Sequence, residues 1–177
     1  MWTMRKRIGG ILLLTVALAG CSEITNTVDD AKQQVVEVKN NVDYAAELQT
    51  IAKDTSRVTS ELSAKLDQAA ENARESANPE QTLDQQMEKL KNDETVQKLE
   101  KELDQIDERL SSLDSPPAEL KSLSDKLKQY VDQSESMTRL LETDVSLDTL
   151  NQLGVEQGQR LQDAISSWTE RLDPFTK

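Results

Sequence analysis

The sequence feature that most constrains the fold is a set of long runs in which apolar residues recur at alternating steps of four and three. This spacing places the apolar side chains on one stripe of an α-helix, which must be buried against another helix. The first run extends from Ile24 to Ala73 and slips near Leu48, because Leu48 and Ile51 each come three residues after the apolar residue before them. We expect one long helix over residues 28–75, and a bend near Leu48 would follow from the slip.

Proline residues and capping signals divide the rest of the chain into further helices. Asn78 can cap a helix that begins at Pro79, and the seam of that helix is interrupted at residues 92–95. Pro116 and Pro117 cannot continue a helix but fit the first turn of the next one. After a turn at residues 143–146, a last helical segment passes Gly154, where we expect a break or kink.

These patterns predict an all-α fold, with no period-two run or hairpin signal for a strand. The connections are short, which favours an elongated antiparallel bundle of three to four helices with coiled-coil-like seams. We expect this bundle to occupy residues 28–172 and to be followed by a short tail at residues 173–177. An intermolecular coiled coil is the alternative to a bundle within one chain.

The N-terminal segment has the pattern of an export signal. Three cations at Arg5–Arg7 precede a short apolar stretch, which is too short to span a bilayer comfortably. The segment ends in the motif of bacterial lipoproteins, a leucine and two small residues before a cysteine: Leu18, Ala19, Gly20, Cys21. We therefore expect residues 1–20 to be a signal peptide. The motif implies cleavage before Cys21 and a diacylglyceryl group on its sulfur, with residues 21–27 as a short lipid-anchored segment.

The composition argues against several classes of function. Residues 1–20 contain three of the 21 basic residues and no acidic residue, so cleavage would move the net charge from −12 to −15. Such a charge repels nucleic acid, and we expect no nucleic-acid partner. The chain has no histidine, which removes the mechanisms and metal sites that depend on imidazole. Cys21 is the only cysteine, so no disulfide can form within the chain.

The order of these features resembles that of a known group. The lipoprotein motif is followed by Asn41-Val42-Asp43-Tyr44-Ala45 early in the first helix and by Leu113-Asp114-Ser115-Pro116-Pro117-Ala118-Glu119-Leu120 before the third. This layout resembles the small YjhA-type lipoproteins of Bacillus and its relatives, an uncharacterised family. The resemblance implies a Gram-positive host and a protein on the outer face of the cytoplasmic membrane. It brings no catalytic residues.

Two clusters could carry a function beyond the anchor. The acidic residues Glu100, Glu102, Asp104, Asp107 and Glu108 could hold a hard cation, but interleaved basic residues favour a solvated helix face. Trp168 continues an apolar stripe, and packing in the core is the main interpretation. The alternative is an exposed patch of Trp168 and Phe175 that docks a partner.

The sequence therefore predicts a membrane-anchored lipoprotein that is not an enzyme and needs no cofactor or metal. We expect its partners to be the membrane, through the lipid on Cys21, and another envelope protein that the bundle binds as an interaction or structural module. The alternative is a binding module for a small apolar or cationic ligand. A cavity lined by Met87 and Met137 would favour that alternative.

Overall fold

A computed structural model describes the backbone of residues 23–113 and 115–176, and the side chains from residue 40 onward. The predicted signal peptide and the cleavage motif at residues 18–21 lie outside this part. The described residues form helices and short connections, with no strand among them, which confirms the all-α prediction. Glu37–Lys177 form a compact unit of their own, distinct from Met1–Val36, and the packing described below is that of the later unit.

The first helix, α1, spans Glu23–Arg74 without interruption. It begins five residues before the predicted start and continues through Leu48, so the slip in the apolar spacing does not break it. From Ala45 onward its apolar residues at steps of three and four are buried. Ala52 and Ala70, which lie beside the main stripe, are also buried, and their small side chains let the neighbouring helices approach closely.

Two helices follow where the sequence predicts one interrupted helix. Helix α2 spans Pro79–Lys91 and α3 spans Glu94–Ser112. Asp93 separates them, because its carboxylate accepts hydrogen bonds from the backbone N–H groups of Thr95 and Val96 and so caps α3. Asn78 is at the N-cap position and Pro79 begins the helix, as predicted, but the Asn78 side chain makes no capping hydrogen bond. Instead, the hydroxyls of Ser76 and Thr82 are 2.6 Å apart across the α1–α2 turn.

Helix α4 spans Ala118–Thr138 and ends in a 3₁₀ turn, η1, at Arg139–Glu142. It starts directly after Pro117, as expected of two prolines that cannot extend α3. Ser115 in this connection has a φ of 51°, a left-handed conformation that favours glycine.

The last helical segment changes its geometry along its length. A short turn, α5 at Leu147–Thr149, leads into a π-helical segment, η2 at Leu150–Glu156, and then into α6 at Gln157–Leu172. The irregularity lies where a break or kink near Gly154 was predicted, but the backbone widens into a π-helix and does not break. The predicted tail begins with a further 3₁₀ turn, η3 at Asp173–Phe175.

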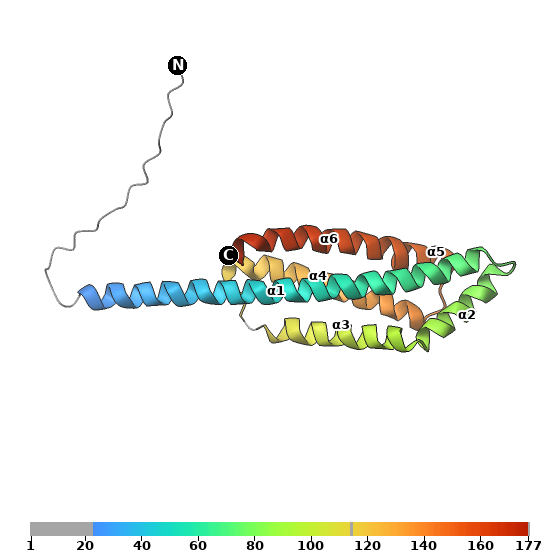
Figure 1. Cartoon of the computed structure of the whole chain (residues 1–177), viewed down its shortest axis with the longest axis horizontal. Helices are drawn as coiled ribbons and strands as arrows, with labels where there is room; N and C mark the ends of the chain where they lie inside the picture. Colours follow the sequence, from blue (N-terminus) through green and yellow to red (C-terminus); the bar gives the residue numbers. More distant parts are fainter. Residues whose placement is uncertain (1–22, 114, 177) are drawn as a thin grey trace, which may run out of the picture. The chain divides into compact units, whose positions relative to one another are not determined.

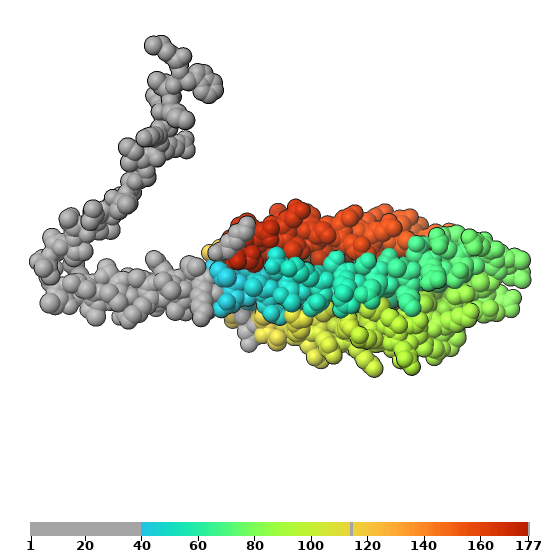
Figure 2. Space-filling model, in the orientation of Figure 1, coloured from blue at the N-terminus to red at the C-terminus, as the bar shows by residue number. Residues whose placement is uncertain are grey.

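The hydrogen bonds between helices define the topology of the bundle. Arg109 of α3 and Asp173 after α6 bond to the early part of the described α1, at Glu47 and Gln49, so both helices run antiparallel to α1. Helix α4 runs parallel to α1, because Tyr44 meets Ser124. Figure 1 shows these elements side by side, and Figure 2 shows α1 between α6 and α3 on one face. The structure is thus an up-and-down bundle with four helical legs, in which α2 and α3 together form the second.

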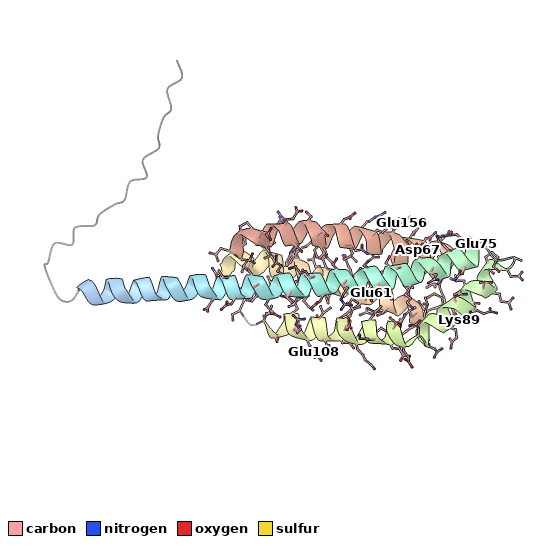
Figure 3. The ribbon with its side chains drawn as sticks, in the orientation of Figure 1. Glu61, Asp67, Glu75, Lys89, Glu108 and Glu156 are labelled. Carbon is pink, nitrogen blue, oxygen red and sulfur yellow. The ribbon has the colours of Figure 1, made fainter. Side chains whose placement is uncertain are left out.

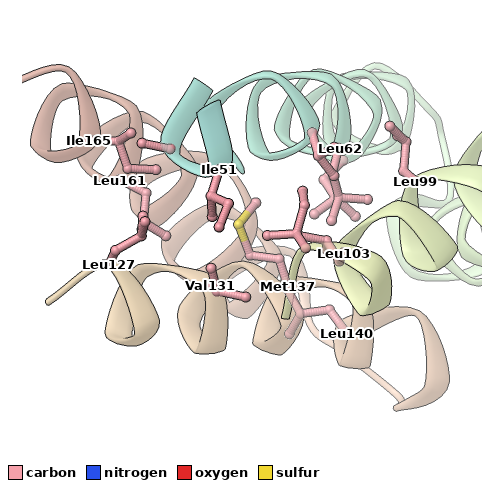
Figure 4. Packing of buried hydrophobic residues seen from close by; sticks show 14 of the residues in the cluster. Ile51, Leu62, Leu99, Leu103, Leu127, Val131, Met137, Leu140, Leu161 and Ile165 are labelled. Atoms are coloured by element: carbon pink, nitrogen blue, oxygen red, sulfur yellow. The ribbon is translucent and has the colours of Figure 1, made fainter. Parts of the chain in front are cut away.

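The core is a single apolar cluster to which every leg contributes. Figure 4 shows Leu62 of α1 near Leu103 of α3, and Ile51 of α1 near Val131 and Met137 of α4. The charged residues labelled in Figure 3 are on the surface of the same unit. Among the described side chains, from residue 40 onward, the apolar seams are therefore buried within one chain.

A ladder of hydroxyl groups crosses the core. Thr55 and Thr59 of α1 are buried and donate to carbonyl oxygens four residues earlier, and the Thr59 hydroxyl is also 2.7 Å from that of Ser134 on α4. Among the described side chains, no buried nitrogen or oxygen atom lacks a hydrogen-bond partner. The ladder is therefore compatible with an otherwise apolar core, because each buried hydroxyl is satisfied.

Candidate functional site

The structure places the predicted aromatic residues in or against the core. Trp168 is only 2% exposed, and its indole N–H donates to the backbone carbonyl oxygen of Leu123 across 3.0 Å. Phe175 is half-buried and packs against the core cluster. Trp168 and Phe175 therefore do not form an exposed patch, because the apolar stripe that carries Trp168 faces α4. Cys21, the predicted lipidation site, lies outside the described residues.

The surface has a long groove between α4 and α6. Its first part, which we call the Lys126 hollow, has a volume of about 780 Å³ and is lined by Lys121, Lys126 and Tyr130 from α4 and by Ala164, Trp168 and Arg171 from α6. The hydrogen bond from Trp168 to Leu123 joins the two helices at this hollow. The small side chain of Ala164 leaves the space between the helices open to solvent.

A second depression continues the groove. This part, which we call the Leu153 hollow, has a volume of about 630 Å³ and is lined by Gln133, Leu153, Glu156, Arg160, Leu161 and Ala164. Ala164 lines both hollows, so the two are adjacent. Leu153 is 45% exposed and is the one large apolar side chain classed as exposed among the described residues. Along α4 the groove extends from Ala118 to Gln133, about 22 Å at the rise of an α-helix.

The Lys126 hollow contains more basic than acidic residues, although the protein as a whole is acidic. Lys126 donates to the neutral side chain of Gln129 across 3.0 Å, and its ammonium nitrogen is 5.2 Å from the centre of the Tyr130 ring. This arrangement fits a cation–π contact. Lys121 forms a long exposed pair with Asp125, at 3.8 Å. Three basic residues and one acidic residue line the hollow, whereas the whole chain has 33 acidic and 21 basic residues. The Lys126 hollow is therefore locally positive, on a chain whose net charge is −12.

The π-helical segment is packed tightly on α1. The Ser63 hydroxyl donates to the carbonyl oxygens of Gly154 and Val155, at 3.3 and 3.5 Å. A Cβ atom placed on Gly158 would lie 2.5 Å from Ser63 Oγ and 2.7 Å from Ser63 Cβ. No side chain fits there without a shift, so Gly158 is required by the close approach of α6 to α1. The hydrogen bonds from Ser63 hold the π-helical segment against α1, and Leu153 of this segment is exposed to solvent.

Ion pairs fix α1 to α3 on another side of the bundle. Arg109 bridges two carboxylates of α1, Glu47 at 2.8 Å and Asp54 at 2.7 Å. Hydrogen bonds to these carboxylates raise the pKa of the Arg109 guanidinium above its ordinary value. Arg57 likewise joins Glu102 of α3 and Glu61 of its own helix. These contacts are partly exposed, and their role is to align the two helices.

The acidic residues 100–108 of α3 do not all face the same helix. Glu102 faces α1, where its bond to Arg57 lowers its pKa. Asp107 faces α4 and pairs with Lys128 at 2.9 Å. Glu100 is partly buried, and this burial raises its pKa, with repulsion from Glu142 and Asp104 adding to the effect. Among the described residues, no three acidic, cysteine or histidine side chains are placed to hold a metal ion.

A mixed set of charges surrounds Glu135 on the α4 side of the same surface. Partial burial raises the pKa of Glu135, and repulsion from Asp107, Asp132 and Asp104 adds to the effect, while Arg139 opposes it. Lys128 bridges Asp107 and Asp132, at 2.9 and 3.5 Å, so the acids on each side of it are partly neutralised. The surface between α3 and α4 therefore carries several carboxylates that repel one another weakly.

The two methionines that sequence analysis considered as cavity-lining residues are in the core cluster. Met87 is 7% exposed and Met137 is 1% exposed, and neither lines a hollow of the α4/α6 groove. In the part of the chain that the structure describes, no helix is apolar and long enough to cross a bilayer.

Comparison with known proteins gives no relative: no family model, curated protein or solved structure matches this chain. The resemblance to the YjhA-type lipoproteins remains a prediction from the sequence. What can be said of function depends on the groove, on the core and on the N-terminal motif.

Proposed function

We propose that the chain is a lipoprotein anchored through Cys21 to the outer face of the cytoplasmic membrane, where its helical bundle is an interaction or structural module for another envelope protein. The observation that carries the proposal is the contrast between core and surface. The apolar stripes are enclosed within one chain, whereas the α4/α6 groove leaves a positive, partly apolar depression open to a partner.

The proposed anchor is based on the sequence motif Leu18-Ala19-Gly20-Cys21. A diacylglyceryl group supplies two acyl chains, which hold a protein stably, while one chain holds it only marginally. The chain as a whole is repelled by anionic membranes, since its net charge is −12. Membrane attachment is therefore expected to depend on the sulfur of Cys21 alone.

The anchor can be tested with one substitution and a neighbouring control. Cys21→Ser removes the thiol that accepts the lipid, and Ser22→Ala changes the next residue without touching it. We expect Cys21→Ser to move the protein to the soluble fraction and Ser22→Ala to leave it in the membrane after a high-salt wash. A native membrane-bound protein whose Cys21 sulfur carries no lipid, as read by mass spectrometry of its N-terminal peptide, would rule out the lipid anchor.

The proposal includes no catalytic activity. The chain has no histidine, and two carboxylates of the acidic run are engaged by different helices, Glu102 by Arg57 of α1 and Asp107 by Lys128 of α4. A carboxylate enzyme needs two such groups in one site with pKa values pushed apart. An interaction module needs only a stable surface of defined shape and charge, which the bundle provides.

A further inference from the structure

We propose that the α4/α6 groove binds an acidic amphipathic helix of another envelope protein, which lies along the groove as an additional helix of the bundle. This inference rests on the proposed function as an interaction module and names both the surface and the kind of partner. Three properties of the groove support such a partner: its length, the position of its apolar groups and its charge.

The length and shape of the groove fit a helix. It lies between two adjacent helices and extends for about 22 Å, which is the length of a helix of about 15 residues. Ala164 is at its middle, where a small side chain permits a third helix to approach closely. Helices that bind in grooves of this kind present apolar residues on one face.

The apolar groups of the groove are placed to meet such a face. Leu153 is exposed in one hollow, and the half-buried ring of Tyr130 lines the other. Tight packing of the π-helix on Ser63 holds the segment that carries Leu153. The groove is therefore preformed, and binding does not require that segment to reorganise.

The charge of the groove selects an acidic partner. Lys121, Lys126 and Arg171 line the Lys126 hollow, and Asp125 is the only acid among its lining residues. Lys126 bonds only to a neutral amide and an aromatic ring among its described contacts. In the Leu153 hollow, Glu156 is paired with Arg160 at 3.1 Å and adds little net charge. A basic helix would meet these cations at close range, which disfavours binding.

The charge prediction can be tested with peptides and the full-length lipidated chain in neutral phosphatidylcholine nanodiscs. The probe is a labelled helical peptide of about 15 residues with leucines on one face and glutamates on the other, compared with an isomer that has lysines in place of the glutamates. We expect the acidic peptide to bind about tenfold more tightly than the basic one. Equal binding of the two peptides would overturn the proposal.

Charge reversal in the groove then locates the site. Lys121→Glu with Lys126→Glu should weaken binding of the acidic peptide by about tenfold or more. The matched control, Lys89→Glu with Lys91→Glu on α2, changes the net charge equally but lies outside the groove, and it should weaken binding by less than about twofold through long-range repulsion. All four lysines are exposed, so thermal unfolding monitored by circular dichroism should be similar in both variants. A control that weakens binding as much as the groove variant would overturn the site.

Crosslinking in the native membrane separates this inference from the proposed function. A photoreactive amino acid is placed at Gln129 in the groove or at Gln105, an exposed position on α3. We expect Gln129 to capture a different envelope protein, with the crosslinked peptide mapping to an acidic amphipathic helix. A protein adduct only from Gln105 would refute the groove and retain the interaction module, and no adduct from either would count against both. An adduct of Gln129 with lipid, or with a second copy of this chain, would also refute the proposed partner.

Discussion

The indole nitrogen of Trp168 on α6 is 3.0 Å from the carbonyl oxygen of Leu123 on α4, so the largest side chain of the core also joins the two helices that border the groove. Trp168 therefore fills space in the core and fixes the distance between α4 and α6. Its burial makes it a support of the groove and not a contact surface for a partner.

Substitution of Trp168 should separate these two contributions. Trp168→Phe removes the hydrogen bond, worth about 0.5–1.5 kcal/mol, together with part of the ring volume. Trp168→Ala leaves a cavity and should lower the free energy of unfolding by about 3–5 kcal/mol. Chemical denaturation measures both. If the two substitutions lowered the free energy of unfolding equally, the packing of the ring would contribute little to stability, contrary to its buried position.

Fluorescence offers an independent check on the burial of Trp168. In a chain with Trp2→Phe, Trp168 is the only tryptophan. We expect its emission to be blue-shifted in the native protein and to move to longer wavelength on unfolding, because the ring is shielded from water. A native emission maximum typical of water-exposed tryptophan would contradict the buried position.

Gly158→Ala should destabilise the bundle although alanine is the better helix former. The new Cβ would lie within 2.7 Å of two Ser63 atoms, and overpacking of this kind costs about 1–3 kcal/mol, which exceeds the gain of about 1 kcal/mol from helix propensity. Combining it with Ser63→Gly removes both contacts and should recover part of the loss, giving a favourable coupling in a double-mutant cycle. Additive effects of the two substitutions would argue against the close approach of α6 to α1.

The bridge from Arg109 to Glu47 and Asp54 should contribute modestly and in a salt-dependent way. The three side chains are each between one third and one half exposed, so each pair is worth less than about 1 kcal/mol after solvent screening. Arg109→Lys keeps the charge but loses the fork that reaches two carboxylates. We expect a small decrease in thermal stability that is reduced in high salt. Arg160→Lys, which alters a single exposed pair within one helical segment, is the control and should have almost no effect.

Two partly buried carboxyls should give a stability increase on mild acidification. The pKa values of Glu100 and Glu135 are raised in the folded protein, mainly by burial, so the folded state binds protons more readily than the unfolded chain. Their unfavourable contribution is present above the folded pKa values and is relieved as the pH falls towards the unfolded value. We expect Glu100→Gln with Glu135→Gln to raise stability at pH 7 and to flatten this part of the pH profile. Unchanged stability at neutral pH would contradict the burial argument.

Asp93 should make the stability of the folded protein decrease on acidification, the opposite of the effect of Glu100 and Glu135. Its hydrogen bond with Lys65 and its bonds to the first N–H groups of α3 lower its pKa from 3.8 to about 2. The resulting stabilisation is fully present above the unfolded value and is lost as the pH falls through about 2. Asp93→Asn retains a capping side chain but loses the ion pair, so its stability difference from the parent chain should be largest near neutral pH. Acid titration of both proteins by circular dichroism measures this difference.

The apolar spacing was sufficient to predict most of the fold. Thr55 and Ser134 lie at seam positions, four residues after Ile51 and after Tyr130, and both are buried despite being polar. Thr59 and Ser63 were missed, because their burial depends on partners from other helices, Ser134 and the carbonyl oxygen of Gly154. Local pattern does not reveal such tertiary hydrogen bonds.

Capping and helix irregularities were harder to predict for the same reason. Asn78 has the residue type of a cap, but the hydroxyl contact between Ser76 and Thr82 occupies the turn and the Asn78 side chain does not cap. A kink near Gly154 was predicted from glycine alone, whereas the π-helix also reflects the close packing of this segment on Ser63 and Leu66.

The groove could not be predicted, because it exists only where α4 and α6 meet. In the sequence, Lys121, Lys126 and Arg171 are indistinguishable from other surface cations on helices. Trp168 indicated that α6 has a buried face, but not which helix that face contacts. The arrangement of the four legs decides which cations share a hollow.

The first core residue that the structure describes on α1 is Ala45, and the compact unit begins at Glu37. A protease that cleaved next to Val36 would therefore remove none of the described core and would leave both hollows unchanged. Under the proposed lipid anchor, such a cut would release from the membrane a bundle in which the proposed binding surface is intact.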